Sequence, residues 1–186
     1  MSRRLFISVD LDESLYEAIA DVQAPFDRLP GVRAVDPESV HVTLKFLGDV
    51  EDERLEKVGE SLADAVAAAD VGRFTARFGG IGVFPDFDYI SVIWVGVRSG
   101  GSELERLHEA IEAAFVDAGF EPEGHTFTPH VTICRMDHGG AKEQVQDLLR
   151  ARDPDIGEMG VTDVRLTESM LSEDGPAYVT RKVVPL

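Results

Sequence analysis

The stretch His41-Val42-Thr43-Leu44-Lys45-Phe46-Leu47-Gly48 decides the fold, because its first four positions return almost unchanged as His130-Val131-Thr132-Ile133. Both copies are rich in β-branched residues, so each predicts a strand. Segments with apolar residues at helical spacing precede and follow each copy. The repeat therefore predicts two related α+β lobes that face each other.

The two copies also predict which side chains come together. Side chains of a strand alternate between its two faces. His41 and Thr43 therefore point to one side of the first strand, and His130 and Thr132 point to one side of the second. The aliphatic residues between them point the opposite way, into the core of each lobe. If the lobes face each other, two imidazoles and two hydroxyls converge on one site.

Two histidines suit the cleavage of a phosphodiester by general acid–base catalysis. With an unperturbed pKa near roughly 6.5, one ring can be neutral and accept a proton from water while the other is charged and donates one. Threonine hydroxyls can donate hydrogen bonds to the phosphoryl oxygens as charge develops. Arg135 offers a donor fork for phosphate, although strict alternation puts it on the wrong face, so it must act from a strand end or by its reach. Lys45 has the right parity to add charge, and a solvated edge position is an equal alternative.

A zinc site is the rival use of histidines. Zinc wants three or four convergent ligands, and the chain has no His-x-x-x-His and no pair of cysteines. His125, just before the second strand, is a weak candidate for a third ligand. His108 on a helix and His138 in a Gly-rich turn are expected to be solvated, and Cys134, although it shares the His130 face, is expected to be structural. The sequence therefore predicts neither a metal nor a cofactor.

The rest of the chain alternates between strand-like and helix-like segments, which fits a single bilobal domain over residues 1–186 with two pseudo-symmetric lobes. Helices are expected at residues 12–24, ended by Pro25, and at residues 51–69, 102–118 and 141–151. Strands are expected at residues 5–11, 32–35, 40–47, 74–83, 89–97, 127–135, 161–171 and 178–184. The glycine-rich residues 79–82 are expected to form a bulge or a close backbone contact, because no Lys-Ser/Thr pair follows them as in a phosphate-binding loop.

Acidic residues dominate the charge. Lys plus Arg number 18 and Asp plus Glu number 35, so the formal net charge is −17, and the acidic residues are scattered along the whole chain. Scatter indicates a solvated acidic surface, which keeps a protein soluble and monomeric. It favours a halophilic protein in a high-salt cytoplasm, and an acidic surface with a specific basic partner is the alternative. Such a surface does not favour long-range binding of nucleic acid, so if the protein handles RNA, it should hold the RNA locally, at one end.

Cysteine content and hydropathy favour a cytoplasmic location. The single cysteine excludes an internal disulfide and suits a reducing compartment. The apolar run after Arg4 stops at Asp10, which is too short for the core of a signal peptide. No segment approaches the roughly 18 apolar residues of a membrane-spanning helix. We therefore expect no membrane association.

The flanks of the two motifs carry a family resemblance. Further short stretches follow in order along the chain: Arg4-Leu5-Phe6-Ile7, Gly82-Val83-Phe84-Pro85, Trp94-Val95-Gly96-Val97, Thr128-Pro129 before the second motif, Cys134-Arg135 after it, Ser169-Met170-Leu171 and Gly175-Pro176-Ala177-Tyr178. In these stretches the chain resembles the RNA 2′,3′-cyclic phosphodiesterases, also called 2′-5′ RNA ligases, of the two-histidine phosphoesterase superfamily. That family often has a tryptophan before the first motif, and residues 32–35 contain none.

The resemblance implies a bilobal α+β fold in which two antiparallel sheets line a central cleft, with helices on the outside. It implies metal-independent cleavage that leaves the phosphate on the 2′ oxygen. His41 would be the proton donor to the leaving 3′ oxygen and His130 the proton acceptor that activates water, while Thr43, Thr132 and Arg135 would contact the phosphate. The substrate would be RNA ends carrying a 2′,3′-cyclic phosphate, including tRNA fragments. Two alternatives stay open: a 2′-5′ RNA ligase that uses the same histidines, and a non-catalytic nucleotide-binding module.

Overall fold

The computed structural model describes all residues 1–186 and has the expected α+β class. Nine antiparallel strands form one sheet in the order β7-β4-β5-β6-β3-β1-β8-β9, with β2 paired to β6 beside this path. The strands are β1 (Ser2–Asp10), β2 (Val32–Ala34), β3 (His41–Glu51), β4 (Phe74–Pro85), β5 (Ile90–Ser99), β6 (His130–Met136), β7 (Asp155–Val161), β8 (Asp163–Ser172) and β9 (Gly175–Pro185).

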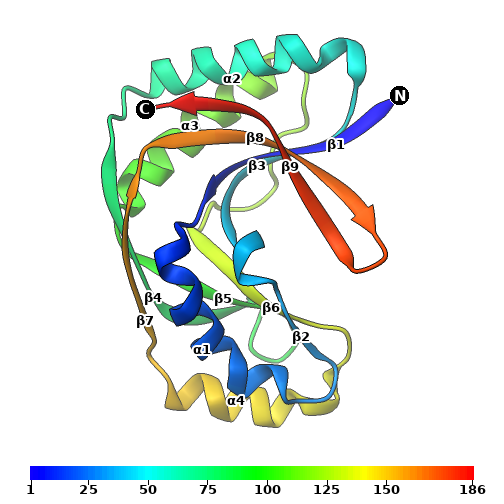
Figure 1. Ribbon diagram of the computed structural model, residues 1–186, viewed down its shortest axis with the longest axis vertical. Coiled ribbons are helices and arrows are strands. Elements are labelled where there is room, and N and C mark those ends of the chain that lie inside the picture. The colour runs from blue at the N-terminus through cyan, green and yellow to red at the C-terminus, as the bar shows by residue number, and fades with distance from the viewer.

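The two halves of the sheet meet at the two motifs. Strands β3 and β6 begin with His41 and His130, and they pair through one facing pair of residues, Val42 and Val131. On one side of this junction β3 continues into β1, β8 and β9, and on the other β6 continues into β5, β4 and β7. The two expected sheets are thus joined into one strongly curled sheet (Figure 1).

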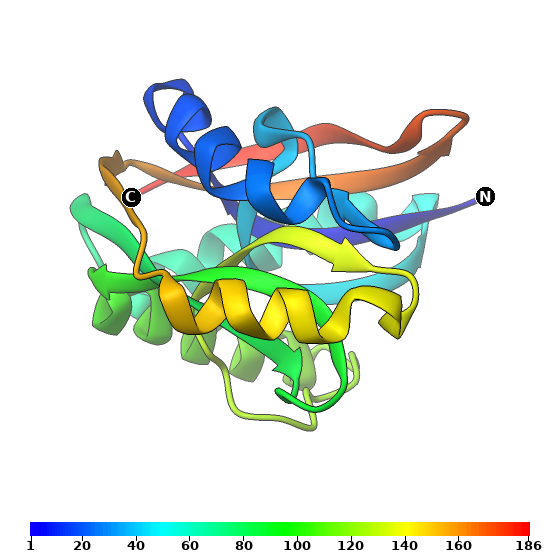
Figure 2. The same ribbon diagram turned by 90° about the horizontal axis from the view of Figure 1, so that it is seen from below.

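The α-helices pack against the sheet in two pairs. Helices α2 (Leu55–Ala69) and α3 (Gly101–Asp117) pack against each other, α2 contacting β8 and β9 and α3 contacting β3 and β5. Helix α1 (Tyr16–Asp27) packs against β2, β6 and β7, and α4 (Lys142–Ala151) lies beside it (Figure 2). None of these helices combines the length and the apolar character that crossing a bilayer requires.

Helix α1 differs from the prediction because it continues through Pro25. A proline inside a helix removes one N–H donor and usually ends the helix. Here Phe26 is fully buried, and Gln23 is 4% exposed and donates from Nε2 to the carbonyls of Val35 at 2.6 Å and Ile133 at 2.8 Å. The tertiary contacts around the proline therefore outweigh its local effect.

Strand β7 is a second difference, since the sequence pattern does not predict it. Gly157 and Gly160 interrupt the run of β-forming residues, and glycine weakens a strand. The strand nevertheless pairs with β4, and Ile156, Met159 and Val161 are buried. The partner strand and the core supply the stability that the local sequence lacks.

A β-bulge interrupts the alternation of side chains at the same position of each motif. In the pairing of β1 with β3, Leu44 has no partner residue opposite it, and in the pairing of β5 with β6 the same holds for Ile133. The extra residue in a bulge re-aims the side chains that follow it. The next residues, Lys45 and Cys134, therefore point into the core, and both are 0% exposed.

The bulges correct three assignments made from strict alternation. Lys45 neither joins the site nor lies at a solvated edge, because its Nζ donates to Glu112 Oε2 at 2.5 Å and to the Glu121 carbonyl at 3.0 Å inside the protein. Cys134 does not share the face of the second histidine, and burial raises the pKa of its thiol to about 12. Arg135, which strict alternation puts on the wrong face, returns to the face of the histidines and is exposed.

Candidate active site

His41 is held at the start of β3 between two aromatic rings. Its ring stacks on Phe6 with centroids 4.8 Å apart and an interplanar angle of 25°, and the edge of Tyr178 meets it at 5.4 Å. The Nδ1 atom of His41 lies 2.8 Å from the carbonyl of Ser39, the last residue of the short 3-10 turn Pro37–Ser39. The ring therefore has little freedom to rotate.

His130 is held in the same way at the start of β6. Phe84 meets its ring edge-on at 4.9 Å, and Trp94 lies 5.7 Å away at 53°. Its Nδ1 lies 2.6 Å from the carbonyl of Thr128. A Cβ on Gly82 would come within 2.2 Å of the Trp94 indole, so only glycine lets this ring lie against β4. The expectation of a close backbone contact within residues 79–82 is thus confirmed.

The tether to a backbone carbonyl sets the same tautomer for both rings. A carbonyl accepts but cannot donate, so Nδ1 must carry the hydrogen of each neutral imidazole. The Nε2 atom of each ring is then left to accept a proton when the ring is neutral or to donate one when it is charged. Both histidines are therefore prepared for proton transfer through Nε2.

The junction of β3 and β6 brings the two motifs together on one face. Because the antiparallel pair is centred on Val42 and Val131, His41 lies beside Thr132, and Thr43 lies beside His130. The two valines are 1% and 0% exposed, so these four polar residues occupy the opposite side of the sheet, which we call the histidine face.

The groups around the two histidines influence the pKa of each ring. Burial lowers the pKa of His41 below its ordinary value, the Ser39 carbonyl and the charge of Asp10 oppose this shift, and Arg135 and His130 lower the pKa further. Burial also lowers the pKa of His130; the Thr128 carbonyl opposes the shift, and His125 adds to it. Burial therefore favours the neutral form of both rings, and the carboxylate of Asp10 opposes this effect at His41.

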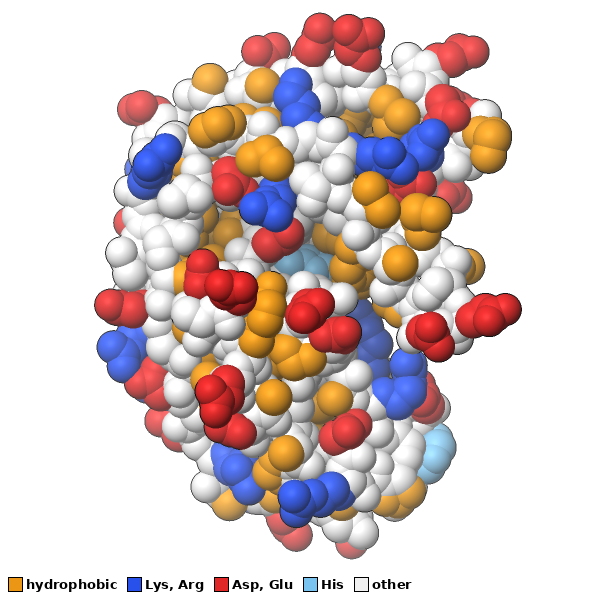
Figure 3. Space-filling view, viewed as in Figure 1, with side chains coloured by type: hydrophobic (Ala, Val, Ile, Leu, Met, Phe, Trp, Pro, Cys, Tyr) orange, Lys and Arg blue, Asp and Glu red, His pale blue; other side chains and the backbone are white.

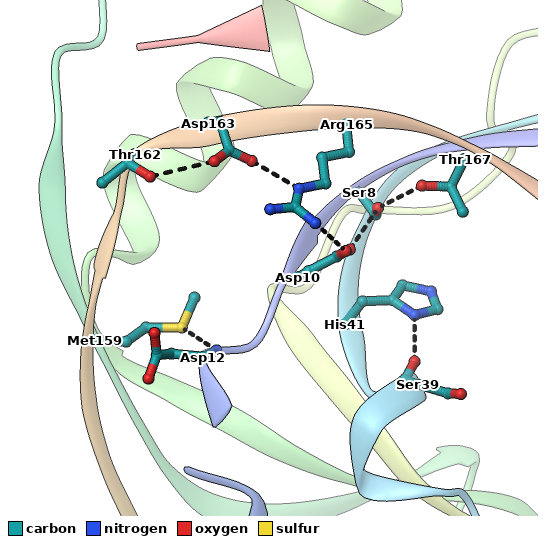
Figure 4. A network of polar contacts seen from close by, with 10 residues as sticks. All are labelled: Ser8, Asp10, Asp12, Ser39, His41, Met159, Thr162, Asp163, Arg165 and Thr167. Atoms are coloured by element: carbon teal, nitrogen blue, oxygen red, sulfur yellow. Dashed lines mark hydrogen bonds and ion pairs between the residues drawn. The ribbon is translucent and has the colours of Figure 1, made fainter. Parts of the chain in front are cut away.

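Asp10 is a residue of the site that the sequence reasoning missed. It faces His41 in the register of β1 with β3. Its carboxylate accepts from Ser8 Oγ at 3.0 Å and from an Arg165 guanidinium nitrogen at 3.1 Å, and Ser8 Oγ lies 3.3 Å from the hydroxyl of Thr167 (Figure 4). Asp10 has the same strand parity as Phe6 and Ser8, and this is the signal that could have placed it on the histidine face.

Two adjoining hollows open beside this network. One, of about 250 Å³, is lined by His41, Phe6 and Tyr178, and the other, of about 330 Å³, extends toward Arg165 and Asp163. Asp10 and Glu38 line both hollows. Elsewhere on the visible face the acidic side chains are spread widely (Figure 3), as the scatter along the sequence predicts.

The remaining histidines do not build a metal site. His108 is buried, which contradicts the expectation that it is solvated, whereas His138 and His125 are exposed. No group of three or more His, Cys, Asp or Glu side chains is arranged to hold a metal ion. The structure brings together His41, Thr43, His130, Thr132 and Arg135 and excludes Lys45.

This geometry defines the class of the protein. A curled antiparallel sheet whose two His-x-Thr strands meet at its centre, each presenting one imidazole, is the architecture of a two-histidine phosphoesterase. Within that class the chain belongs to the 2′-5′ RNA ligase superfamily, whose sequence model matches residues 11–169.

Individual relatives are similar over the whole chain. The RNA 2′,3′-cyclic phosphodiesterase of Archaeoglobus fulgidus is 34% identical over 97% of this chain and 98% of its own length. The protein of the same name from Methanothermobacter thermautotrophicus is 32% identical, with 100% of both chains covered. Among solved structures, TT0787 of Thermus thermophilus has a TM-score of 0.81 at 26% identity, covering 98% of this chain and 97% of its own. Apo LigT of E. coli has a TM-score of 0.75 at 25% identity, covering 100% and 98%.

Proposed function

We propose that this protein is an RNA 2′,3′-cyclic phosphodiesterase that opens terminal 2′,3′-cyclic phosphates to 2′-phosphomonoesters. The observation that carries the proposal is the matched tethering of two imidazoles. Each donates Nδ1–H to the carbonyl two residues before it and leaves Nε2 free for proton transfer on the same face of the sheet. The names of the Archaeoglobus and Methanothermobacter relatives support the same activity.

The reaction needs one base and one acid. Neutral His130 accepts a proton at Nε2 from a water molecule, whose oxygen attacks the phosphorus. Charged His41 donates its Nε2 proton to the 3′ oxygen as the bond between phosphorus and that oxygen breaks. The hydroxyl from water stays on phosphorus, the 3′-hydroxyl is released, and the phosphate keeps its bond to the 2′ oxygen. The two histidines account for every proton that moves.

The groups around the two rings bear on this assignment of roles in different ways. Burial lowers the pKa of His41, and the Asp10 charge works against this shift and so favours the protonated form that the acid requires. Burial, with a smaller contribution from His125, lowers the pKa of His130 and so favours the neutral form, which the base requires. The negative charge of a bound phosphodiester adds to the effect of Asp10, because an opposite charge stabilises the imidazolium.

The phosphate is held by groups around the two rings. The hydroxyls of Thr43 and Thr132 donate to its non-bridging oxygens, and the Arg135 guanidinium offers a planar pair of donors. Because the net charge is −17, the protein holds only the RNA end and not the rest of the backbone. We propose that it acts on RNA ends, including tRNA fragments, as a monomeric bilobal domain of the cytoplasm.

A 2′-5′ RNA ligase is the second candidate, and the superfamily name favours it. With a 5′-hydroxyl in place of water, the same proton transfers join two RNA ends through a 2′-5′ linkage. A reaction with a 5′-hydroxyl oligonucleotide present distinguishes the two activities, because the ligase forms a longer RNA and the hydrolase does not.

The hydrolase is tested by incubating the purified protein with adenosine 2′,3′-cyclic phosphate in EDTA and following the products by ³¹P NMR. We expect adenosine 2′-phosphate to form at the same rate with and without the chelator. His41→Ala and His130→Ala proteins, purified in parallel, control for a contaminating activity. Exclusive formation of the 3′-phosphate, or a loss of turnover that zinc or magnesium restores, would overturn the proposal.

A further inference from the structure

The second motif is reached through a long segment without helix or strand. Helix α3 ends at Asp117 and β6 begins at His130. The segment between them includes Thr128, whose carbonyl accepts the Nδ1–H of His130 at 2.6 Å. The orientation of the His130 ring therefore depends on where this segment is held. Segments of this kind are usually mobile, so their anchors decide their position.

His108 supplies the first anchor. It lies on α3, is 9% exposed, and stacks on Phe127 with ring centroids 4.1 Å apart and an interplanar angle of 11°. Its Nδ1 lies 2.7 Å from the carbonyl of Leu44. Phe127 directly precedes Thr128, so the stacked pair fixes the residue next to the carbonyl that orients His130.

Glu112 supplies the second anchor, one helical turn further along α3. Its Oε2 accepts from Lys45 Nζ at 2.5 Å, and its Oε1 accepts from the backbone N–H of Glu123 at 2.8 Å. Lys45 also donates to the carbonyl of Glu121 at 3.0 Å. Burial alone would raise the pKa of Glu112, but the hydrogen bonds from Lys45 and Glu123 and the charge of Lys45 hold it below its ordinary value. The carboxylate is therefore charged and binds both partners firmly.

Both anchors meet β3 at its bulge. The carbonyl that His108 contacts belongs to Leu44, and the ammonium that Glu112 contacts belongs to Lys45. These two residues directly follow Thr43 of the first motif. The bulge turns Lys45 inward, toward α3, so the local irregularity of the first motif is what allows contact with the segment that leads to the second.

We propose that His108 is a positioning residue for His130. Together with Glu112 and Lys45 it forms a brace, the α3 brace, that fixes residues 119–129 and thereby the orientation of the base relative to the first motif. The proposal rests on the proposed function, because it assumes that His130 is the base. The stacking partner of His108 is Phe127 and its hydrogen-bond partner is the carbonyl of Leu44, so it acts on His130 indirectly, through Phe127 and Thr128.

The test compares three variants of the full chain. His108→Ala removes both the stacking and the hydrogen bond, whereas His108→Phe keeps a ring on Phe127. Leu104→Ala, at a fully buried position on the same helix, is the matched control for a general loss of stability. The readouts are kcat/KM for a nucleoside 2′,3′-cyclic phosphate, the melting temperature, and the pKa of each histidine from NMR titration. The chain has 5 histidines, few enough to be assigned one by one.

The α3 brace predicts a specific pattern. His108→Ala lowers kcat/KM by about tenfold, since small displacements of a catalytic group are costly. It also raises the pKa of His130 toward 6.5 as burial is lost and leaves that of His41 in place. His108→Phe keeps most of the activity, and Leu104→Ala shifts neither pKa. If His108→Ala matches Leu104→Ala in melting temperature, kcat/KM and the pKa of His130, the residue is merely structural and the proposal is wrong.

Two further measurements distinguish a failure of the α3 brace from misfolding of a variant and from a failure of the proposed function. If His108→Ala does not fold, Phe127→Leu removes the same stacking from the other side, and an unchanged His130 pKa in that variant overturns the brace. The titration needs no turnover. A wild type without activity would therefore refute the proposed function, while the His130 titration would still decide the α3 brace.

Discussion

Replacing Lys45 by methionine should destabilise the protein because it leaves the partly buried carboxylate of Glu112 without its partner. The side chain of Lys45 is 0% exposed and that of Glu112 is 21% exposed, and their charged groups lie 2.5 Å apart. Removing one partner of a buried ion pair leaves the other charge without compensation and costs about 3–5 kcal/mol. Because Glu112 keeps some contact with water, we expect a loss near the lower end, about 3 kcal/mol.

The double variant Lys45→Met/Glu112→Leu shows whether the stability loss of Lys45→Met comes from the unpaired Glu112 carboxylate or from lost packing. It removes the unpaired carboxylate, and beyond what Lys45→Met already loses it gives up mainly the hydrogen bond from the Glu123 N–H, a loss of about 1–2 kcal/mol. The double variant should therefore be more stable than Lys45→Met. Urea unfolding at pH 7 and fixed salt measures both, and with a slope of about 2 kcal/mol/M the single variant should lose about 1.5 M in midpoint. A double variant no more stable than Lys45→Met would refute this reasoning.

The same pair predicts how the stability difference depends on pH. The folded-state pKa of Glu112 lies below its ordinary value of 4.5, so unfolded chains bind more protons there in the window just below 4.5. The stability that the pair contributes is fully present above pH 4.5 and is lost as the pH falls through the folded-state pKa. The gap between wild type and Lys45→Met should accordingly narrow in acid, and a gap that widens there would contradict the assignment.

Three further predictions concern the site and its support. The profile of kcat/KM against pH should be bell-shaped, with limbs that belong to the histidine pair: activity falls in acid as His130 becomes charged, and in base as His41 loses its proton. Because burial lowers the pKa of both histidines in the free protein, the maximum should lie below pH 7. A maximum above pH 8 would contradict this. Cys134 should resist a thiol reagent at pH 8 in the native protein and react after unfolding in urea, whereas rapid native labelling would show that it is accessible. Val131→Ala should lower the free energy of unfolding by about 1–3 kcal/mol and leave kcat largely unchanged. His130→Ala should instead lower the rate by a factor of about 10²–10⁴ and leave the fold intact. Equal losses of melting temperature in both variants would mean that His130 is a core residue.

The histidines and threonines of the site could be predicted because their placement depends only on the sequence of each motif and on the alternation of side chains along a strand. The repeat His-Val-Thr-Leu/Ile identifies two strands, and the alternation of side chains correctly puts the histidines and threonines opposite the valines. The alternation fails one residue after each motif. A bulge depends on how a strand pairs with its neighbour, which a single sequence does not reveal, so strict alternation puts Lys45, Cys134 and Arg135 on the wrong faces.

Other differences also arise from tertiary contacts. Helix α1 passes Pro25 because neighbouring side chains are needed in the core, and β7 forms because β4 offers a partner. His108 is the one buried histidine that the sequence could have revealed. It follows Leu104 by four residues and precedes Ile111 by three, so it belongs to the apolar face of its helix.

The central claim, that His41 is the acid and His130 the base on one phosphate, is tested most directly by changing the leaving group. A 3′-deoxynucleoside 2′-(4-nitrophenyl phosphate) presents nitrophenolate in place of the 3′ oxygen, and this group leaves without needing a proton. The measurement is the ratio of kcat/KM for this substrate to that for the 2′,3′-cyclic phosphate, in wild type, His41→Ala and His130→Ala. We predict that the activated substrate restores much of the rate of His41→Ala and little of that of His130→Ala, because the attacking water of the latter still lacks its base. Rescue of His130→Ala without rescue of His41→Ala would contradict the assignment of acid and base.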